Sequence, residues 1–157
     1  MTEQEIFFKL LQYSNELLEN NKYLRKEDYE AYLALLKFLV RIENNLHYAE
    51  KDLYIELLND FLDDKITAED FSFSYIGIYE GISKKLKHMK RDFNNNKDQL
   101  AEFLLKPEQS EFGLLLARIY GDCDHYNPDS DSHLADEEEL RNHTRILLLE
   151  IQLNSAE

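Results

Sequence analysis

The 157-residue sequence predicts an all-α protein, and three observations carry that prediction. Apolar residues recur at three- and four-residue steps along most of the chain, which is the period of an amphipathic helix. The chain contains only four Gly and two Pro, whereas sheets and sandwiches need more turn-forming residues. Apolar residues make up 43% of the sequence and aromatic residues 12%, which is enough for the buried core of one domain.

The first 45 residues predict a helical hairpin. A helix over residues 3–19 carries Ile6, Leu10 and Leu17 on one stripe, and a polar stretch follows it at residues 20–22. A second helix over residues 26–44 opens with acidic residues, which interact favourably with the helix dipole. We therefore treat residues 1–45 as an N-terminal extension of the main domain.

Residues 46–157 predict a helical bundle. Thr67 is a good N-cap for a helix towards residue 91, in which Gly77 and Gly81 favour a kink or an early end near Gly81. Between residues 122 and 135 a Pro, several Ser and four Asp predict an exposed loop. The expected helices span residues 48–63, 68–91, 98–105 and 110–121, and a last helix opens at Asp136.

The charge balance limits the kinds of partner that the protein is expected to bind. The chain has 32 acidic and 18 basic residues and a formal net charge of −14. Such a surface repels phosphate backbones and anionic membranes, so we expect neither nucleic acid nor membrane as a partner. It attracts a basic protein instead. The basic run at residues 84–91 is interpreted as a solvated helix face.

The single cysteine and the N-terminus predict a cytoplasmic protein. Cys123 has no second cysteine with which to form an internal disulfide, which fits a reducing compartment. The first residues carry acids where a signal peptide needs positive charge.

The sequence offers no convincing catalytic residue or cofactor motif. Cys123 stands between Asp122 and Asp124, whose charges suppress the reactive thiolate. No Gly-rich phosphate loop or dinucleotide fingerprint is present. We therefore expect a protein that is not an enzyme and that binds no cofactor.

Two features suggest metal ligands, and both have simpler interpretations. Glu139 and His143 share a helix face, but no second matching pair accompanies them, which favours a solvated surface pair. The stretch from residue 127 to residue 138 partly follows EF-hand spacing, but Ser132 stands where the turn needs Gly and Pro128 intrudes. The sequence prediction is therefore that the chain has no metal site.

The main functional candidate is an acidic cluster. Eight carboxylates lie between Asp122 and Glu139, and such crowding is self-repulsive. A solubilising loop is one interpretation, and a docking patch for a basic partner is the other, with Tyr126 and Tyr120 as aromatic anchors. The predicted partner-binding residues are Asp122, Asp124, Tyr126, Asp129, Asp131, Asp136, Glu137 and Glu138.

Two segments resemble the colicin D-type immunity proteins, over about 100 of the 157 residues. The stretch KITAEDF at residues 65–71 is similar to the Ile-Thr/Ser-Ala-x-x-Phe element that follows a helix and a short polar break in this family. The stretch DHYNPDSD at residues 124–131 is similar to its acidic–aromatic–Pro–Asp element. The chain departs from the family in about 50 preceding residues, a longer connection at residues 82–110, and Asn127 where an acid can occur.

The resemblance implies a fold and an activity. It implies a four-helix bundle with helices near residues 52–63, 67–80, 111–122 and 136–152. It also implies that the protein blocks the active site of a tRNA-cleaving toxin, with carboxylates standing in for substrate phosphates. Asp124, Asp129 and Asp131 would face the toxin.

Together these observations define one prediction and one alternative. The prediction is an antiparallel four-helix bundle with an additional N-terminal helical hairpin. Its function is that of an immunity protein, a monomer or weak dimer, which occludes the basic cleft of a nuclease toxin. The alternative is a non-catalytic helical adaptor or assembly protein that binds a different protein, with the hairpin as its main interface.

Overall fold

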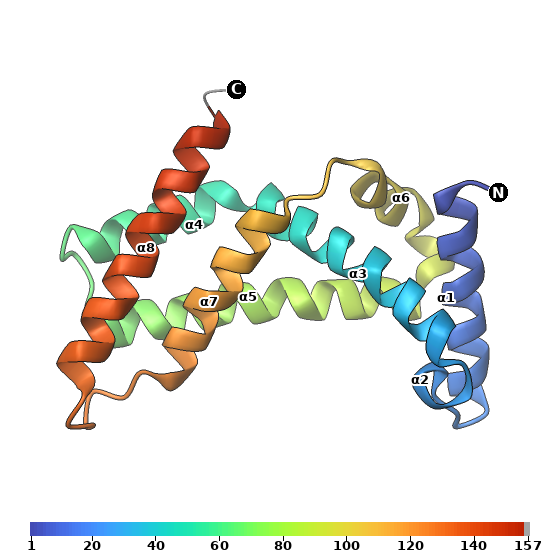
Figure 1. Ribbon diagram of the computed structural model, residues 1–157, viewed down its shortest axis with the longest axis horizontal. Helices are drawn as coiled ribbons and strands as arrows, with labels where there is room; N and C mark the ends of the chain where they lie inside the picture. The colour runs from blue at the N-terminus through green and yellow to red at the C-terminus, as the bar shows by residue number, and fades with distance from the viewer. Residues whose placement is uncertain (156–157) are drawn as a thin grey trace. The chain divides into compact units, whose positions relative to one another are not determined.

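The computed structural model describes residues 1–155, and these residues form an all-α protein (Figure 1). They contain eight α-helices, one short 3₁₀ helix and no strand, which confirms the predicted fold class. None of the helices in this part of the chain has both the length and the apolar content needed to cross a membrane.

The chain forms two compact units. Unit 1 comprises Met1–Leu46 and Ser83–Glu108, and unit 2 comprises His47–Ile82 and the chain from Gln109 onward. Two of the three boundaries fall inside α3 (Tyr29–Ala49) and α5 (Ala68–Arg91), so each of these helices contributes to both units. Residues 83–108, which the sequence analysis grouped with the bundle, cluster with unit 1. The proposed division at residue 45 stays a prediction.

Unit 1 begins as the sequence predicts and then differs at Asp28. The predicted helix over residues 26–44 is a short helix followed by α3, because the Asp28 carboxylate accepts a hydrogen bond from the Ala31 N–H at 3.1 Å and caps α3. The other helices of the unit are α1 (Glu3–Glu19), α2 (Leu24–Glu27), η1 (Phe93–Asn95) and α6 (Lys97–Leu105).

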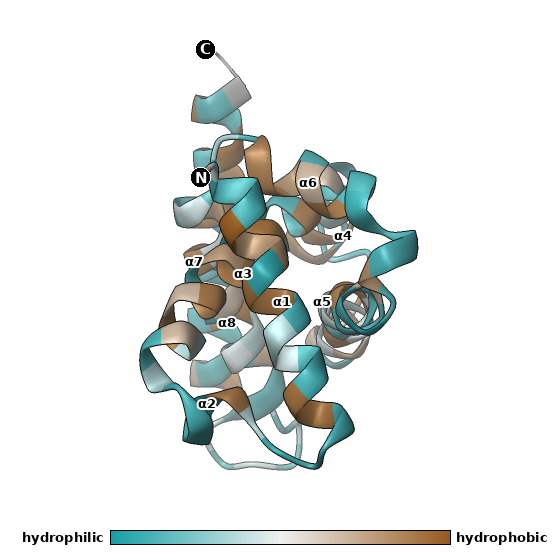
Figure 2. Ribbon diagram, turned by 90° about the vertical axis from the view of Figure 1, so that its right-hand side faces the viewer, coloured by the Kyte–Doolittle hydropathy of each residue, from teal (hydrophilic) through white to brown (hydrophobic). Residues whose placement is uncertain are grey.

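The core of unit 1 is apolar, with one satisfied polar group. Phe7, Ile42 and Leu100 are fully buried. Asn45 is also buried, and its amide donates hydrogen bonds to the Phe103 carbonyl at 2.7 Å and to a second carbonyl just after α6. These bonds satisfy acceptors that the end of a helix leaves without intrahelical partners. The ribbon of α1 alternates between brown and teal, as expected for an amphipathic helix (Figure 2).

Unit 2 contains α4 (Lys51–Leu62), the first part of α5, α7 (Ser110–His125) and α8 (His133–Ser155). Thr67 caps α5 as predicted, since its hydroxyl accepts a hydrogen bond from the Asp70 N–H at 3.1 Å. The predicted helix over residues 68–91 is confirmed, because α5 spans Ala68–Arg91 and does not end early at Gly81.

The predicted loop at residues 122–135 is too long at both ends. Helix α7 continues to His125 and α8 begins at His133, so the connection is confined to residues 126–132. The helix continues because Cys123, only 3% exposed, extends the buried stripe of Leu116 and Ile119. Buried side chains at this spacing hold a helical segment whatever the polarity of its outer face.

Aromatic contacts form much of the core of unit 2. Phe61 of α4 stacks on Phe71 of α5 with ring centroids 4.4 Å apart, and Tyr54 lies 5.5 Å from Tyr75. The Tyr75 hydroxyl donates to the Leu116 carbonyl at 2.7 Å, which ties α5 to α7. Burial raises the pKa of Tyr75 well above its usual value, so this hydroxyl stays a donor.

Helix α8 adds Leu140, Leu147 and Ile151 to the core.

His47, in the last turn of α3, is a buried neutral histidine. It is 2% exposed, its Nδ1 lies 2.8 Å from the Tyr54 hydroxyl, and its ring stacks on Tyr79 at 4.5 Å. Burial lowers its pKa to about 4. Within the described residues, its Nε2 has no hydrogen-bond partner that would stabilise a proton there.

We expect unit 2 to lose stability as the pH falls from 6.5 towards 4. Below pH 6.5 the unfolded chain binds a proton at His47, while the folded chain does not until about pH 4. The free energy of unfolding therefore falls by about 3 kcal/mol across this window. Denaturant titrations at several pH values test this, with His47→Gln as the non-titrating comparison. An identical pH slope in both proteins would show that His47 does not carry the effect.

Candidate functional site

The acidic residues gather at the end of unit 2 where α7 joins α8. These two helices pack extensively against each other and are connected by residues 126–132 (Figure 1). Asp122 and Asp124 lie in the last turn of α7, and Asp136–Glu139 lie in the first turns of α8. The packing therefore brings together two acidic stretches that come from different helices.

The acidic excess of the whole chain lies in unit 2. Unit 2 has 20 of the 32 acidic and 5 of the 18 basic residues, a formal charge of −15. Unit 1 has the remaining 12 acidic and 13 basic residues, a formal charge of +1. The electrostatic attraction for a cationic partner thus belongs to unit 2.

Four of the seven predicted partner-binding acids already have partners. Each pairs with a side chain of α8 or of the connection that precedes it. The pairs are Asp122 with His143, Asp136 with the Ser132 hydroxyl at 3.0 Å, Glu137 with Arg141 at 3.8 Å, and Glu138 with Arg145 at 3.9 Å. A partner protein would have to compete with these contacts.

The remaining three acids are exposed and unpaired. The carboxylates of Asp124, Asp129 and Asp131 make no hydrogen bond or ion pair within residues 1–155. The connection has a defined local shape, because the Asp129 N–H donates to the Asn127 side chain at 3.0 Å in an Asx turn. These three carboxylates can therefore bind a cationic group without losing an internal contact.

The two tyrosines proposed as anchors differ in their surroundings. Tyr126 is half-buried, and burial together with Glu137 raises its pKa, so its hydroxyl stays protonated beside the acidic cluster. Tyr120 stacks on Tyr79 at 4.4 Å and donates to Glu80 at 2.7 Å. The ring and the hydroxyl of Tyr120 thus both have partners within unit 2 already. Tyr126 is therefore the better candidate for an aromatic anchor.

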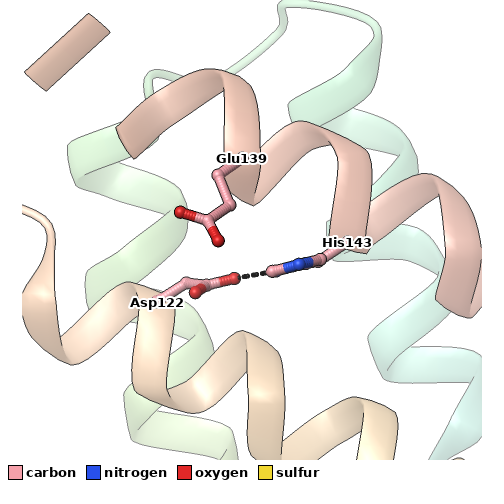
Figure 3. Close-up of side chains that lie close together, drawn as sticks. All are labelled: Asp122, Glu139 and His143. Atoms are coloured by element: carbon pink, nitrogen blue, oxygen red, sulfur yellow. Dashed lines mark hydrogen bonds and ion pairs between the residues drawn. The ribbon is translucent and has the colours of Figure 1, made fainter. Parts of the chain in front are cut away.

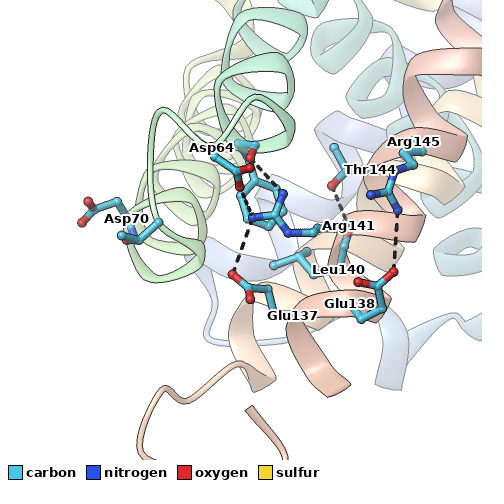
Figure 4. Close-up of polar contacts among 10 residues, drawn as sticks. Asp64, Asp70, Glu137, Glu138, Leu140, Arg141, Thr144 and Arg145 are labelled. Carbon is cyan, nitrogen blue, oxygen red and sulfur yellow. Dashed lines mark hydrogen bonds and ion pairs between the residues drawn. The ribbon is translucent and has the colours of Figure 1, made fainter. Parts of the chain in front are cut away.

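Arg141 connects the acidic end of α8 to the end of α4 (Figure 4). Its guanidinium donates to the Phe61 carbonyl at 3.1 Å and to the Asp64 carboxylate at 2.7 Å. It also lies over the Phe61 ring, 4.5 Å from the centroid. The Arg141 side chain is 17% exposed, whereas that of Arg145, one turn later, is 54% exposed.

We expect Arg141→Gln to lower the free energy of unfolding by about 2 kcal/mol. The substitution removes charged hydrogen bonds to a helix-end carbonyl and a carboxylate. Arg145→Gln is the matched control, because its exposed ion pair with Glu138 should contribute less than about 0.5 kcal/mol. Chemical denaturation of the two variants checks this. Equal destabilisation would contradict the role given to Arg141.

Asp122, Glu139 and His143 converge in space (Figure 3). Their potential ligand atoms all lie within 4.8 Å of one another, and this is the one such group of three found among the described residues. Helical spacing predicts that Glu139 and His143 share a face, but it does not indicate Asp122 as a third member. The sequence predicts a loop at Asp122, whereas α7 includes this residue and directs it towards α8.

Cys123 lies beside this group in sequence but has different surroundings. It is 3% exposed, and burial raises the pKa of its thiol to about 12, with the Asp122 charge acting in the same direction. The neighbouring charges that the sequence shows are thus a smaller cause than burial. The thiol is therefore protonated at neutral pH.

Comparison of the chain with protein-family models, with characterised proteins and with solved structures found no significant match.

Proposed function

We propose that the protein is an immunity protein of the colicin D type, which binds a basic nuclease toxin of the tRNase class and occludes its active-site cleft. The observation that carries the proposal is the set of exposed, unpaired carboxylates of Asp124, Asp129 and Asp131 on a unit of charge −15. In this proposal α4, α5, α7 and α8 act as an antiparallel four-helix bundle, and residues 1–45 are a hairpin extension.

The proposed mechanism is electrostatic mimicry of the substrate. A nuclease cleft lined by Lys and Arg binds phosphates, and carboxylates at similar separations can occupy the same positions. The field of unit 2 steers the toxin to the surface and accelerates association. Final affinity then comes from the free acids at the centre, with Tyr126 as an aromatic contact at the same surface. The proposed protein acts in the cytoplasm as a monomer or weak dimer and needs no catalytic residue.

Capture of a partner from the native host tests this proposal. We expect the full chain to retain a basic nuclease and to release it near 1 M salt, where the screening length falls to about 3 Å. The captured nuclease should lose activity when the purified chain is added. The triple variant Asp124→Asn/Asp129→Asn/Asp131→Asn should bind at least about 30-fold more weakly, because truncating one member of a buried charged pair costs about 2–5 kcal/mol.

A second triple variant distinguishes the effect of where the acids lie from the effect of net charge. Asp52→Asn/Glu56→Gln/Asp63→Asn changes three other exposed acids of unit 2, and so changes the net charge by the same amount. We expect its affinity to stay within about threefold of the wild-type value. Equal loss in both triple variants would mean that only the overall charge matters, and the proposed surface would be wrong.

A second candidate function is a helical adaptor that binds through unit 1. Tyr29, Leu33, Leu36 and Val40 follow each other at three- and four-residue steps on α3 and are 56%, 40%, 39% and 43% exposed. An exposed apolar stripe with this spacing is the kind of surface against which a partner helix packs. This observation favours a protein partner for unit 1 that differs from the basic partner proposed for unit 2.

Substitutions in the stripe distinguish the two candidates. Leu33→Ser/Leu36→Ser alters the exposed stripe and leaves the acidic residues unchanged. Under the immunity proposal the captured nuclease still binds and is still inhibited. Loss of the captured partner in this variant, with full retention in the Asp124/Asp129/Asp131 triple variant, would favour the adaptor function instead.

A further inference from the structure

We propose that Asp122, Glu139 and His143 form a binding site for a divalent transition-metal ion, and that Zn²⁺ is the ion that suits it. The inference rests on the convergence of three ligand-bearing side chains from two helices, all within 4.8 Å. It does not depend on the proposed immunity function.

The three side chains are held by well-packed helices. Asp122 comes from the last turn of α7, and Glu139 and His143 stand four residues apart on α8, which packs against α7. The side chains of Asp122 and His143 are only 20% and 18% exposed, while Glu139 is exposed. Two ligands are therefore positioned by packing, and the third faces solvent, where water can complete the coordination.

The donor set favours a transition metal over Ca²⁺ or Mg²⁺. One imidazole nitrogen with two carboxylates is a ligand set that Zn²⁺ accepts, whereas Ca²⁺ and Mg²⁺ prefer oxygen ligands throughout. In a tetrahedral zinc site with bonds of about 2.0–2.2 Å, ligand atoms lie about 3.4 Å apart. The ligand atoms lie within 4.8 Å of one another, and the exposed Glu139 side chain can adjust its position by a rotamer change.

The local charges also favour a cation at this point. His143 pairs with Asp122, while the Glu139 carboxylate makes no hydrogen bond or ion pair within residues 1–155. Two carboxylates thus lie close together beside one imidazole, in a unit of charge −15. A dication bound to all three groups offsets this repulsion. Its binding requires a neutral imidazole nitrogen, so any proton on that nitrogen passes to solvent.

Metal titration of the full chain, stripped with a chelator, tests the proposal. We expect calorimetry to give one Zn²⁺ per chain. At a free concentration near 100 times Kd, Tm should rise by about 5–10 °C. Ca²⁺ and Mg²⁺ at the same concentration should produce no comparable rise. Absence of zinc binding, or an equal response to all three ions, would overturn the proposal.

Matched variants show whether these residues bind the ion. Glu139→Gln changes an exposed side chain, so the fold should persist while zinc affinity falls at least 10-fold, and His143→Gln should do the same. Glu138→Gln and His125→Gln are exposed controls that should retain the wild-type affinity. If Glu139→Gln binds normally, or His125→Gln loses the ion equally, the binding is adventitious and the site is wrong. None of these measurements involves a toxin.

Discussion

The acidic end of unit 2 depends on the packing of α8 against α7 and α4. This packing brings the last turn of α7 and the first turns of α8 to the same end of unit 2, although their charges repel. Three cationic or ionisable side chains of α8 offset that repulsion from within: Arg141, His143 and Arg145 each pair with an acidic side chain. The apolar residues that hold α8 in place, such as Leu140 and Leu147, flank these polar positions on either side. The helix thus carries both the core contacts and the counter-charges.

Such pairing divides the carboxylates into two groups with different chemical roles. Asp64 and Asp122 pair with α8 side chains from other segments and help to hold α8 in place, while Glu137 and Glu138 pair with arginines of α8 itself. Asp124, Asp129 and Asp131 contribute to the field of the unit without an internal role. Solubility alone does not require that some carboxylates be paired and others unpaired. A docking surface benefits from unpaired carboxylates, because they can bind a partner without breaking internal contacts.

The sequence predicted the helices well and their ends less well. Apolar periodicity placed α1 at its observed bounds and α6 to within one residue. The charge pattern predicts that Asp28 lies in a first helical turn, whereas it is the cap between two helices. Composition predicts a loop at Asp122 and Asp124, because it cannot distinguish a loop from the polar outer face of a helix whose inner face carries Ile119 and Cys123.

The candidate site was predictable in its residues but not in its contacts. The acidic run between Asp122 and Glu139 is visible in the sequence alone. Three of its pairs are local, but Asp122 with His143 joins two helices, and Asp64 with Arg141 ties the same end to a residue far away along the chain. Only the packing of α7, α8 and α4 brings these residues together, and helical periodicity does not specify that packing.

Protection of living cells tests the central claim most directly. The full chain is produced in a sensitive bacterial strain together with the nuclease captured from the host, and survival is measured against a strain that carries the nuclease alone. The account predicts survival with the wild-type chain and with the Asp52/Glu56/Asp63 variant, and killing with the Asp124/Asp129/Asp131 variant. Killing in the presence of the wild-type chain, at a concentration that saturates binding, would contradict the account.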